Sequence, residues 1–161
     1  MAIMDKFNEF ADEYDIASPG TAATVLLTNQ IDTGVVRDIG VGRAPYLVIA
    51  VGATEIITGG SAGTLTFRLV SDDSASIHAT TCSIHYVSKA FVTDDANANE
   101  LEVGSILVCL PLPSGGGAEP YERYLGVQAI IATTTITAGT LNAYLTYDPP
   151  TQWKAYADAT N

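Results

Sequence analysis

The run TLTFRLV, from Thr64 to Val70, decides the fold class of this sequence. Leu65, Phe67 and Leu69 alternate with polar residues, so in an extended chain they fall on one face. This period of two is typical of a strand that covers a core on one side only. The run from Thr140 to Tyr147 repeats the pattern. In that run we expect Leu141, Ala143, Leu145 and Tyr147 to point inward and Asn142, Tyr144 and Thr146 to point outward.

Other short runs of β-branched and apolar residues precede and follow these two. They are separated by turn residues, mainly Gly, Pro, Asp, Asn and Ser, and no ten-residue helical pattern lies between them. This spacing favours an all-β fold, an antiparallel β-sandwich of the jelly-roll type, over a βαβ architecture. The remaining predicted strands are Ala23 to Thr28, Pro45 to Val51, Ile77 to Val87, Ser105 to Leu110, Glu122 to Ile131 and the short Thr133 to Thr137.

The two ends of the chain differ from its middle. Residues 1–20 place their apolar side chains at nearly helical spacing, which fits either an N-terminal arm or a short amphipathic helix. The sandwich domain is predicted to span residues 21–148. Residues 149–161 form a C-terminal tail, because Pro149 and Pro150 end the preceding strand. The tail carries the only tryptophan, and either covers one end of the sandwich or docks on a neighbouring protein.

Composition restricts the partners of this protein. The chain has 161 residues and a formal charge of −11, yet only 16% of its residues are charged and 47% are hydrophobic. Such a chain folds as one domain rather than staying disordered. Its seven Lys and Arg residues are scattered, so we expect it to bind neither nucleic acid nor an anionic membrane. Charged residues also interrupt the N-terminal apolar run, so we expect no signal peptide and synthesis in the cytoplasm.

One motif matches an enzyme signature. Residues 59–63 read GGSAG and fit the GxSxG pattern that presents a nucleophilic serine in hydrolases. That chemistry needs a strand, a sharp turn and then a helix, whereas Ser61 is followed by a predicted strand. We therefore interpret the motif as a hairpin loop and predict that the protein is not an enzyme and has no catalytic residue.

Metal and cofactor sites are not predicted either. On one strand, His78 and His85 would face opposite sides of a sheet, and we interpret Cys82 and Cys109 as reduced, small hydrophobic residues in strands. The paired acids Asp72-Asp73 and Asp94-Asp95 lie in predicted loops without calcium-loop spacing. We interpret them as solvated turn residues, with occasional cation binding as the alternative.

Five segments, in this order, resemble a known family. They are MAIMDKFNEFADEYDI from Met1, IDTGVVRDIGVGRAPYLVIAV from Ile31, AGTLTFRLVSDD from Ala62, LPLPSGGGAEPYERYLGVQ from Leu110 and TAGTLNAYLTYD from Thr137. Together they are similar to the small capsid cement, or decoration, proteins of tailed bacteriophages, which have a jelly-roll fold. The resemblance covers most of the chain.

The resemblance implies a structural virion protein with no catalytic residue or cofactor. It would be made in the host cytoplasm, sit on the exterior of the capsid, bridge major capsid protein subunits and stabilise the shell. Its partners would be the major capsid protein and further copies of itself, with a dimer favoured. The apolar anchors at the two ends are the candidate contact residues: Ile3, Phe7, Phe10, Tyr14, Trp153 and Tyr156.

A second function stays open at this point. Jelly rolls often serve as carbohydrate- or receptor-binding modules of virions, and tyrosine-rich surfaces can stack on sugars. Fold alone does not separate this alternative from a cement protein.

Overall fold

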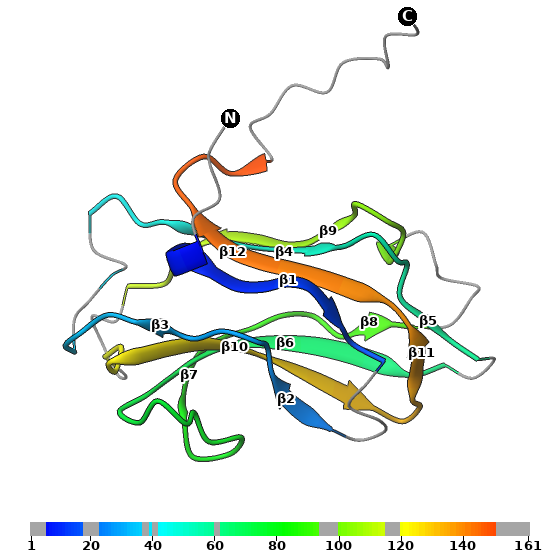
Figure 1. The fold of residues 1–161 in the computed structure, drawn as a ribbon, viewed down its shortest axis with the longest axis horizontal. Helices are drawn as coiled ribbons and strands as arrows, with labels where there is room; N and C mark the ends of the chain where they lie inside the picture. The colour runs from blue at the N-terminus through cyan, green and yellow to red at the C-terminus, as the bar shows by residue number, and fades with distance from the viewer. Residues whose placement is uncertain are drawn as a thin grey trace, which may run out of the picture.

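The computed structural model describes residues 6–17, 23–36, 39, 42–59, 62–93, 100–114 and 120–150. Within these ranges the chain forms antiparallel β-strands and one 3₁₀ turn, η1 (Lys6–Asn8), and it contains no α-helix (Figure 1). No helix in this part of the chain is therefore long and apolar enough to span a membrane.

Two sheets pack face to face as the two layers of a sandwich (Figure 1). The four-stranded sheet has the order β1-β12-β4-β9, and the six-stranded sheet has β2-β10-β6-β7 with β3 beside β10 and β8 beside β6. The strands of the first are β1 (Glu9–Asp15), β4 (Tyr46–Val51), β9 (Ile106–Pro111) and β12 (Thr140–Thr146). Those of the second are β2 (Thr24–Leu26), β3 (Ile31–Asp32), β6 (Thr64–Asp72), β7 (Ser83–Val87), β8 (Phe91–Val92) and β10 (Tyr124–Ala132).

The order of the strands follows a jelly roll. β2 and β3 pair with the same edge of β10, and β7 and β8 pair with the same edge of β6, so each couple acts as one interrupted strand. We count each couple as one strand, leave out β5 and β11, and number the strands in chain order. The strand orders of the two sheets are then 1-8-3-6 and 2-7-4-5. Only the connection from β6 to β7 stays within one sheet; the others cross between sheets, as two Greek keys require. A small sheet of β5 (Ile57–Thr58) and β11 (Ile136–Ala138) lies at one end.

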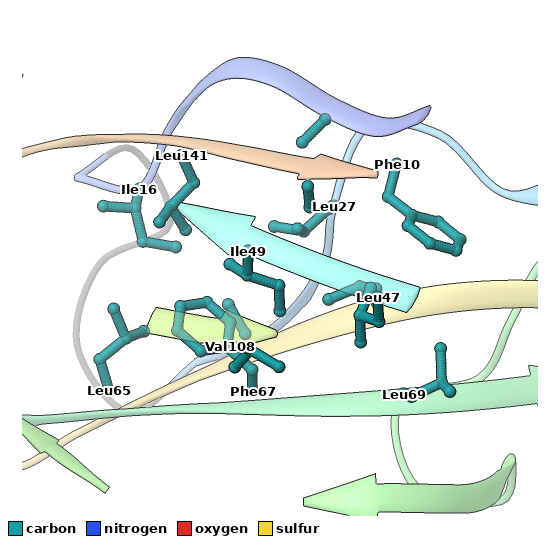
Figure 2. Packing of buried hydrophobic residues seen from close by; sticks show 14 of the residues in the cluster. Phe10, Ile16, Leu27, Leu47, Ile49, Leu65, Phe67, Leu69, Val108 and Leu141 are labelled. Carbon is teal, nitrogen blue, oxygen red and sulfur yellow. The ribbon is translucent and has the colours of Figure 1, made fainter. Parts of the chain in front are cut away.

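The core lies between the two sheets, as the sequence pattern predicts. Leu65, Phe67 and Leu69 of β6 are fully buried, and they face Leu47 and Ile49 of β4 (Figure 2). The longest ladder, between β6 and β10, pairs nine residues without a break. The predicted antiparallel sandwich is therefore confirmed.

Two expectations for the ends of predicted strands were wrong. In the run from Ile77 to Val87, only Ser83–Val87 form a strand, because the residues before Ser83 fold over the outer face of the sheet instead. Tyr147 was expected inward, but it lies just beyond the end of β12 and its side chain is 57% exposed.

The described part of residues 1–20 forms a 3₁₀ turn and a strand of the sandwich rather than an amphipathic helix or a free arm. Residues 9–15 form β1, which pairs with β12 at the edge of the four-stranded sheet. Two register shifts interrupt this pairing, so Phe10 and Ala11 are both buried although they are adjacent in the sequence. These β-bulges explain why the apolar spacing resembled that of a helix.

The turn between β11 and β12 provides the first prediction. Gly139 has φ of +146°, and a Cβ atom there would lie 2.9 Å from the Cα atom of Ile56. We expect Gly139→Ala to lower the free energy of unfolding by about 2–4 kcal/mol. The backbone strain at a positive φ and the overpacking against Ile56 both destabilise the folded state. The measurement is urea denaturation. Gly59→Ala is the control, since its Cβ would make an ordinary 3.5 Å contact with Thr137, and equal losses in both variants would contradict the prediction.

Candidate functional site

The two ends of the described chain lie at the same end of the four-stranded sheet. β1 and β12 are neighbouring antiparallel strands (Figure 1), and Glu9, at the start of β1, pairs with Tyr144 near the end of β12. The turn η1 precedes β1 and contacts β12. Any segment before residue 6 and any segment after residue 150 therefore begins from this end of the sheet.

The six predicted contact residues are not equivalent. The side chain of Phe7 is 83% exposed on η1, whereas Phe10 is fully buried in the core and presents no surface to a partner. Tyr14 is half-buried and packs against the core, where burial raises the pKa of its hydroxyl. Ile3, Trp153 and Tyr156 lie outside the described residues and stay predictions. Phe7 is thus the one described member of the set that is well placed to bind another protein.

Further aromatic residues extend the surface around Phe7. The guanidinium of Arg43 lies 5.3 Å from the ring centre of Tyr147, which follows β12. Tyr46 and Tyr144 point outward from the same sheet. Each alternates with a leucine that faces the core, because Leu47 is buried and its partner Leu145 packs against the core cluster. We define the terminal surface as Phe7, Arg43, Tyr46, Tyr144 and Tyr147.

Part of the terminal surface was predictable from the sequence. The period-2 pattern of the run from Thr140 placed Tyr144 on the outward face, as found. Tyr46 also points outward, but it belongs to the run from Pro45 to Val51, which is apolar throughout. The sequence of that run therefore does not distinguish the inward face of the strand from the outward face. The pairing of Arg43 with Tyr147 joins two residues more than a hundred positions apart and has no local signature.

A carboxylate fixes β1 at the end of the strand that lies away from the terminal surface. Glu13 accepts hydrogen bonds from the Ala53 N–H at 2.8 Å and from the Asn142 side-chain amide at 2.9 Å, and its own N–H donates to Asn142 Oδ1 at 2.7 Å. Glu13 has a left-handed φ of 49°, which turns its side chain toward Gly52. A Cβ atom on Gly52 would lie 2.5 Å from the carboxylate, so the glycine leaves the space that this contact needs.

The contacts of Glu13 also make its charge part of the fold. The hydrogen bonds to Thr140, to the Ala53 N–H and to Asn142, in that order, lower the pKa of the Glu13 carboxyl from its ordinary value of 4.5. A group whose pKa is lower in the folded state stabilises the fold above its unfolded pKa, and this stabilisation is lost as the pH falls through the folded value.

A second exposed apolar surface lies along the opposite edge of the sandwich. We define the edge patch as three exposed aliphatic residues on β7 and β8 that share the outer face of the six-stranded sheet. Next to them, Lys89 and Glu100 form an ion pair at 2.7 Å beside a hollow of about 290 Å³ lined by Phe91, Ile106 and Leu107. The three residues are Ile84, Val87 and Val92, which pair with Val70, Arg68 and Thr64 of β6.

The residues with possible chemistry are dispersed. Ser71 Oγ lies 2.7 Å from His85 Nε2, but Ser71 is fully buried and its oxygen also accepts the Glu122 N–H, which makes the pair part of the packing of the sheet. Ser61 and the acids at 94 and 95 fall outside the described residues. Within the described ranges, no three His, Cys, Asp or Glu residues come close enough to hold a metal ion. Cys82 is buried and Cys109 is half-buried.

The contacts of Glu13 generate a pH-dependent prediction. We expect Glu13→Gln to lower the urea midpoint of unfolding at pH 7, because an amide nitrogen would replace one of the oxygens that accept hydrogen bonds. The difference from the original protein should narrow as the pH falls below 4.5, because the unfolded chain then binds a proton at Glu13 that the folded protein, with its lowered pKa, binds only at lower pH. Asp12→Asn, at the exposed neighbouring position, is the control. A difference that stays constant from pH 7 to pH 3 would contradict the prediction.

Comparisons with known proteins identify the family. A search of curated proteins finds no significant match. Residues 17–145 match the Bbp16 family, a range that begins after β1 and ends within β12. The matched range thus contains most of the sandwich and excludes both Phe7 and Tyr147. The chain belongs to the Bbp16 family of phage-associated proteins.

Proposed function

We propose that this protein is a capsid cement protein that binds the exterior of an assembled phage head through its terminal surface and stabilises the shell. The observation that carries the proposal is the position of both chain ends, with exposed aromatic side chains, at one end of one sheet. Membership of a phage-associated family and the resemblance to cement proteins support it.

The chemistry of the terminal surface suits a protein partner. Aromatic and arginine side chains contribute most of the binding energy at protein interfaces, because they bury a large area at a small entropic cost. Phe7 and Tyr147 present 83% and 57% of their surface, and Arg43 lies against Tyr147. In the proposed role, the partner is the major capsid protein, and the protein acts as a structural component rather than as an enzyme.

Cementing does not require a strong individual contact. Each copy would bridge neighbouring capsid subunits through its terminal surface and through the segments that begin there. Because many copies act on one shell, subunits cannot separate until every bridge between them dissociates. A modest interface per copy is therefore sufficient to stabilise the assembled head.

The terminal surface gives a direct binding test. Removing residues 1–15 would delete β1 and the buried Phe10, so point variants are the better choice. We expect Phe7→Asp and Tyr147→Asp each to reduce the number of copies bound per head, with affinity falling about tenfold, because a charge replaces an exposed aromatic anchor. Purified heads that lack the protein are mixed with each variant and sedimented.

Val36→Asp provides a matched control, since Val36 is 60% exposed and lies outside the terminal surface. Unchanged occupancy for both aromatic variants, with circular dichroism showing a normal fold, would refute the proposed contact. Binding to glycans on an array without binding to heads would instead favour a carbohydrate-binding module.

We further propose that copies of the protein associate with each other through the edge patch. Its three residues are aliphatic, and the nearby charges of Lys89 and Glu100 are already paired, so two copies of an acidic chain can meet there with little repulsion. We expect Val87→Asp to weaken self-association at least about tenfold, measured by sedimentation velocity over a concentration series. Val35→Asp is the control, because Val35 is 57% exposed and lies outside the edge patch. This substitution should leave self-association unchanged. A monomeric original protein, or equal effects of both variants, would contradict this interface.

A further inference from the structure

The outer face of the six-stranded sheet is divided into two parts. The loop before β7 packs on it through Ile77 and Cys82, which are buried beside Val70 of β6. The edge patch lies next to this loop on the same face, where Val87 of β7 pairs with Arg68 of β6. Arg68 therefore lies between the loop and the edge patch.

The side chain of Arg68 points away from the core. Along β6 it alternates with Phe67 and Leu69, which are fully buried between the two sheets. Across the sheet, Arg68 pairs with Gln128 of β10 on one side and with Val87 on the other. Directly opposed side chains have their Cβ atoms about 5 Å apart, so Gln128 and Val87 flank the aliphatic stem of Arg68. The residue is accordingly half-buried.

The guanidinium of Arg68 has no partner among the described residues. Its Nε atom is buried and makes no hydrogen bond, and the ion pairs in the described part of the chain use other basic side chains. The neighbouring Gln128 donates from its side-chain nitrogen to the His78 carbonyl at 3.3 Å, while its Oε1 atom accepts no hydrogen bond. A buried donor without a partner destabilises a fold. Arg68 thus places a charge on this face without forming a bond that would stabilise a single copy.

The other described arginines differ from Arg68 in this respect. Arg123 donates two hydrogen bonds to the carboxylate of Asp32, at 2.8 and 2.9 Å, and Arg43 lies 5.3 Å from the ring centre of Tyr147. The whole chain has 18 acidic residues against seven Lys and Arg, so a second copy offers many carboxylates. The planar guanidinium of arginine matches a carboxylate, which it can bind through two parallel hydrogen bonds.

We propose that Arg68 is the polar centre of the edge-patch interface and that its guanidinium binds a carboxylate of a second copy of this chain. This role presupposes the self-association through the edge patch that is proposed above. Two copies that each carry a formal charge of −11 repel each other, and an unpaired cation beside the aliphatic side chains opposes this repulsion at the point of contact. Arginine is also enriched among the residues that contribute most to binding at interface centres. The charge pair fixes the orientation of the two copies, which three aliphatic side chains alone do not.

Removal of the guanidinium tests this role. Arg68→Met keeps an apolar stem and removes the charge and the donors. We expect it to weaken self-association about tenfold in sedimentation velocity, because a carboxylate of the second copy is then buried without its partner. The urea midpoint of unfolding, measured at a concentration where the protein is monomeric, should be unchanged or higher, because the guanidinium makes no bond within one copy. Lys6→Met is the matched control. It removes the same charge from an exposed residue of η1 and should leave self-association unchanged.

A crosslinking experiment identifies the group that Arg68 contacts. Arg68→Lys places a primary amine at the same position, and a carbodiimide joins an amine to an adjacent carboxylate. The reaction is carried out on an equal mixture of unlabelled and ¹⁵N-labelled copies, so that mass spectrometry distinguishes crosslinks between copies from crosslinks within one copy. We expect crosslinks from position 68 of one copy to an acidic residue of the other.

The outcomes for Arg68 and for the edge patch can be told apart. If Val87→Asp weakens self-association and Arg68→Met does not, the edge patch stands and the role of Arg68 is refuted. If the original protein is monomeric, the interface and the role of Arg68 are refuted together. Crosslinks from position 68 within one copy only, a lower urea midpoint for Arg68→Met, or a loss of head binding without a loss of self-association would each overturn the proposal as well.

Discussion

The antiparallel pairing of β1 with β12 is the constraint on which the functional account depends. It brings the first described strand and the last described strand side by side at the edge of one sheet, so that both ends of the chain leave from the same place. The pairing is irregular, with two bulges, and Glu13 supports it through hydrogen bonds to Asn142 and Thr140 of β12 and to Ala53 after the end of β4. The pairing of Glu9 with Tyr144 and the burial of Phe10 hold the start of β1, and with it the turn that carries Phe7, beside the end of β12.

The two outer faces of the sandwich differ in a way that fits opposite environments. The outer face of the six-stranded sheet is partly covered by its own loop, with Ile77 seated over Gly126. The outer face of the four-stranded sheet carries tyrosines and the exposed aromatic residues at the chain ends. A protein that binds a shell needs one surface for the shell and another that tolerates solvent, and these two faces are suited to those roles.

The sequence predicted the fold class well, because the strands with strict alternation, such as Thr64 to Val70, are long and pair without interruption. It failed where irregular pairing hides the period of two. In β1, the bulges bury Phe10 and Ala11 together and mimic a helical spacing. The short strands β3, β5 and β8 have two residues each, too few to show a period, and they exist because a longer strand offers them an edge.

The candidate site was less accessible to sequence reasoning, because it is assembled from segments far apart in the chain. Phe7 was among the predicted contacts, but the same pattern also selected Phe10, which is a core residue.

The central claim is that the terminal surface faces the capsid, and a cryo-electron microscopy reconstruction of heads carrying this protein tests it most directly. The account predicts density that joins the shell to the protein at Phe7 and Tyr147, with residues 73–82 pointing to solvent. A reconstruction in which residues 73–82 contact the shell and the terminal surface faces outward would contradict it.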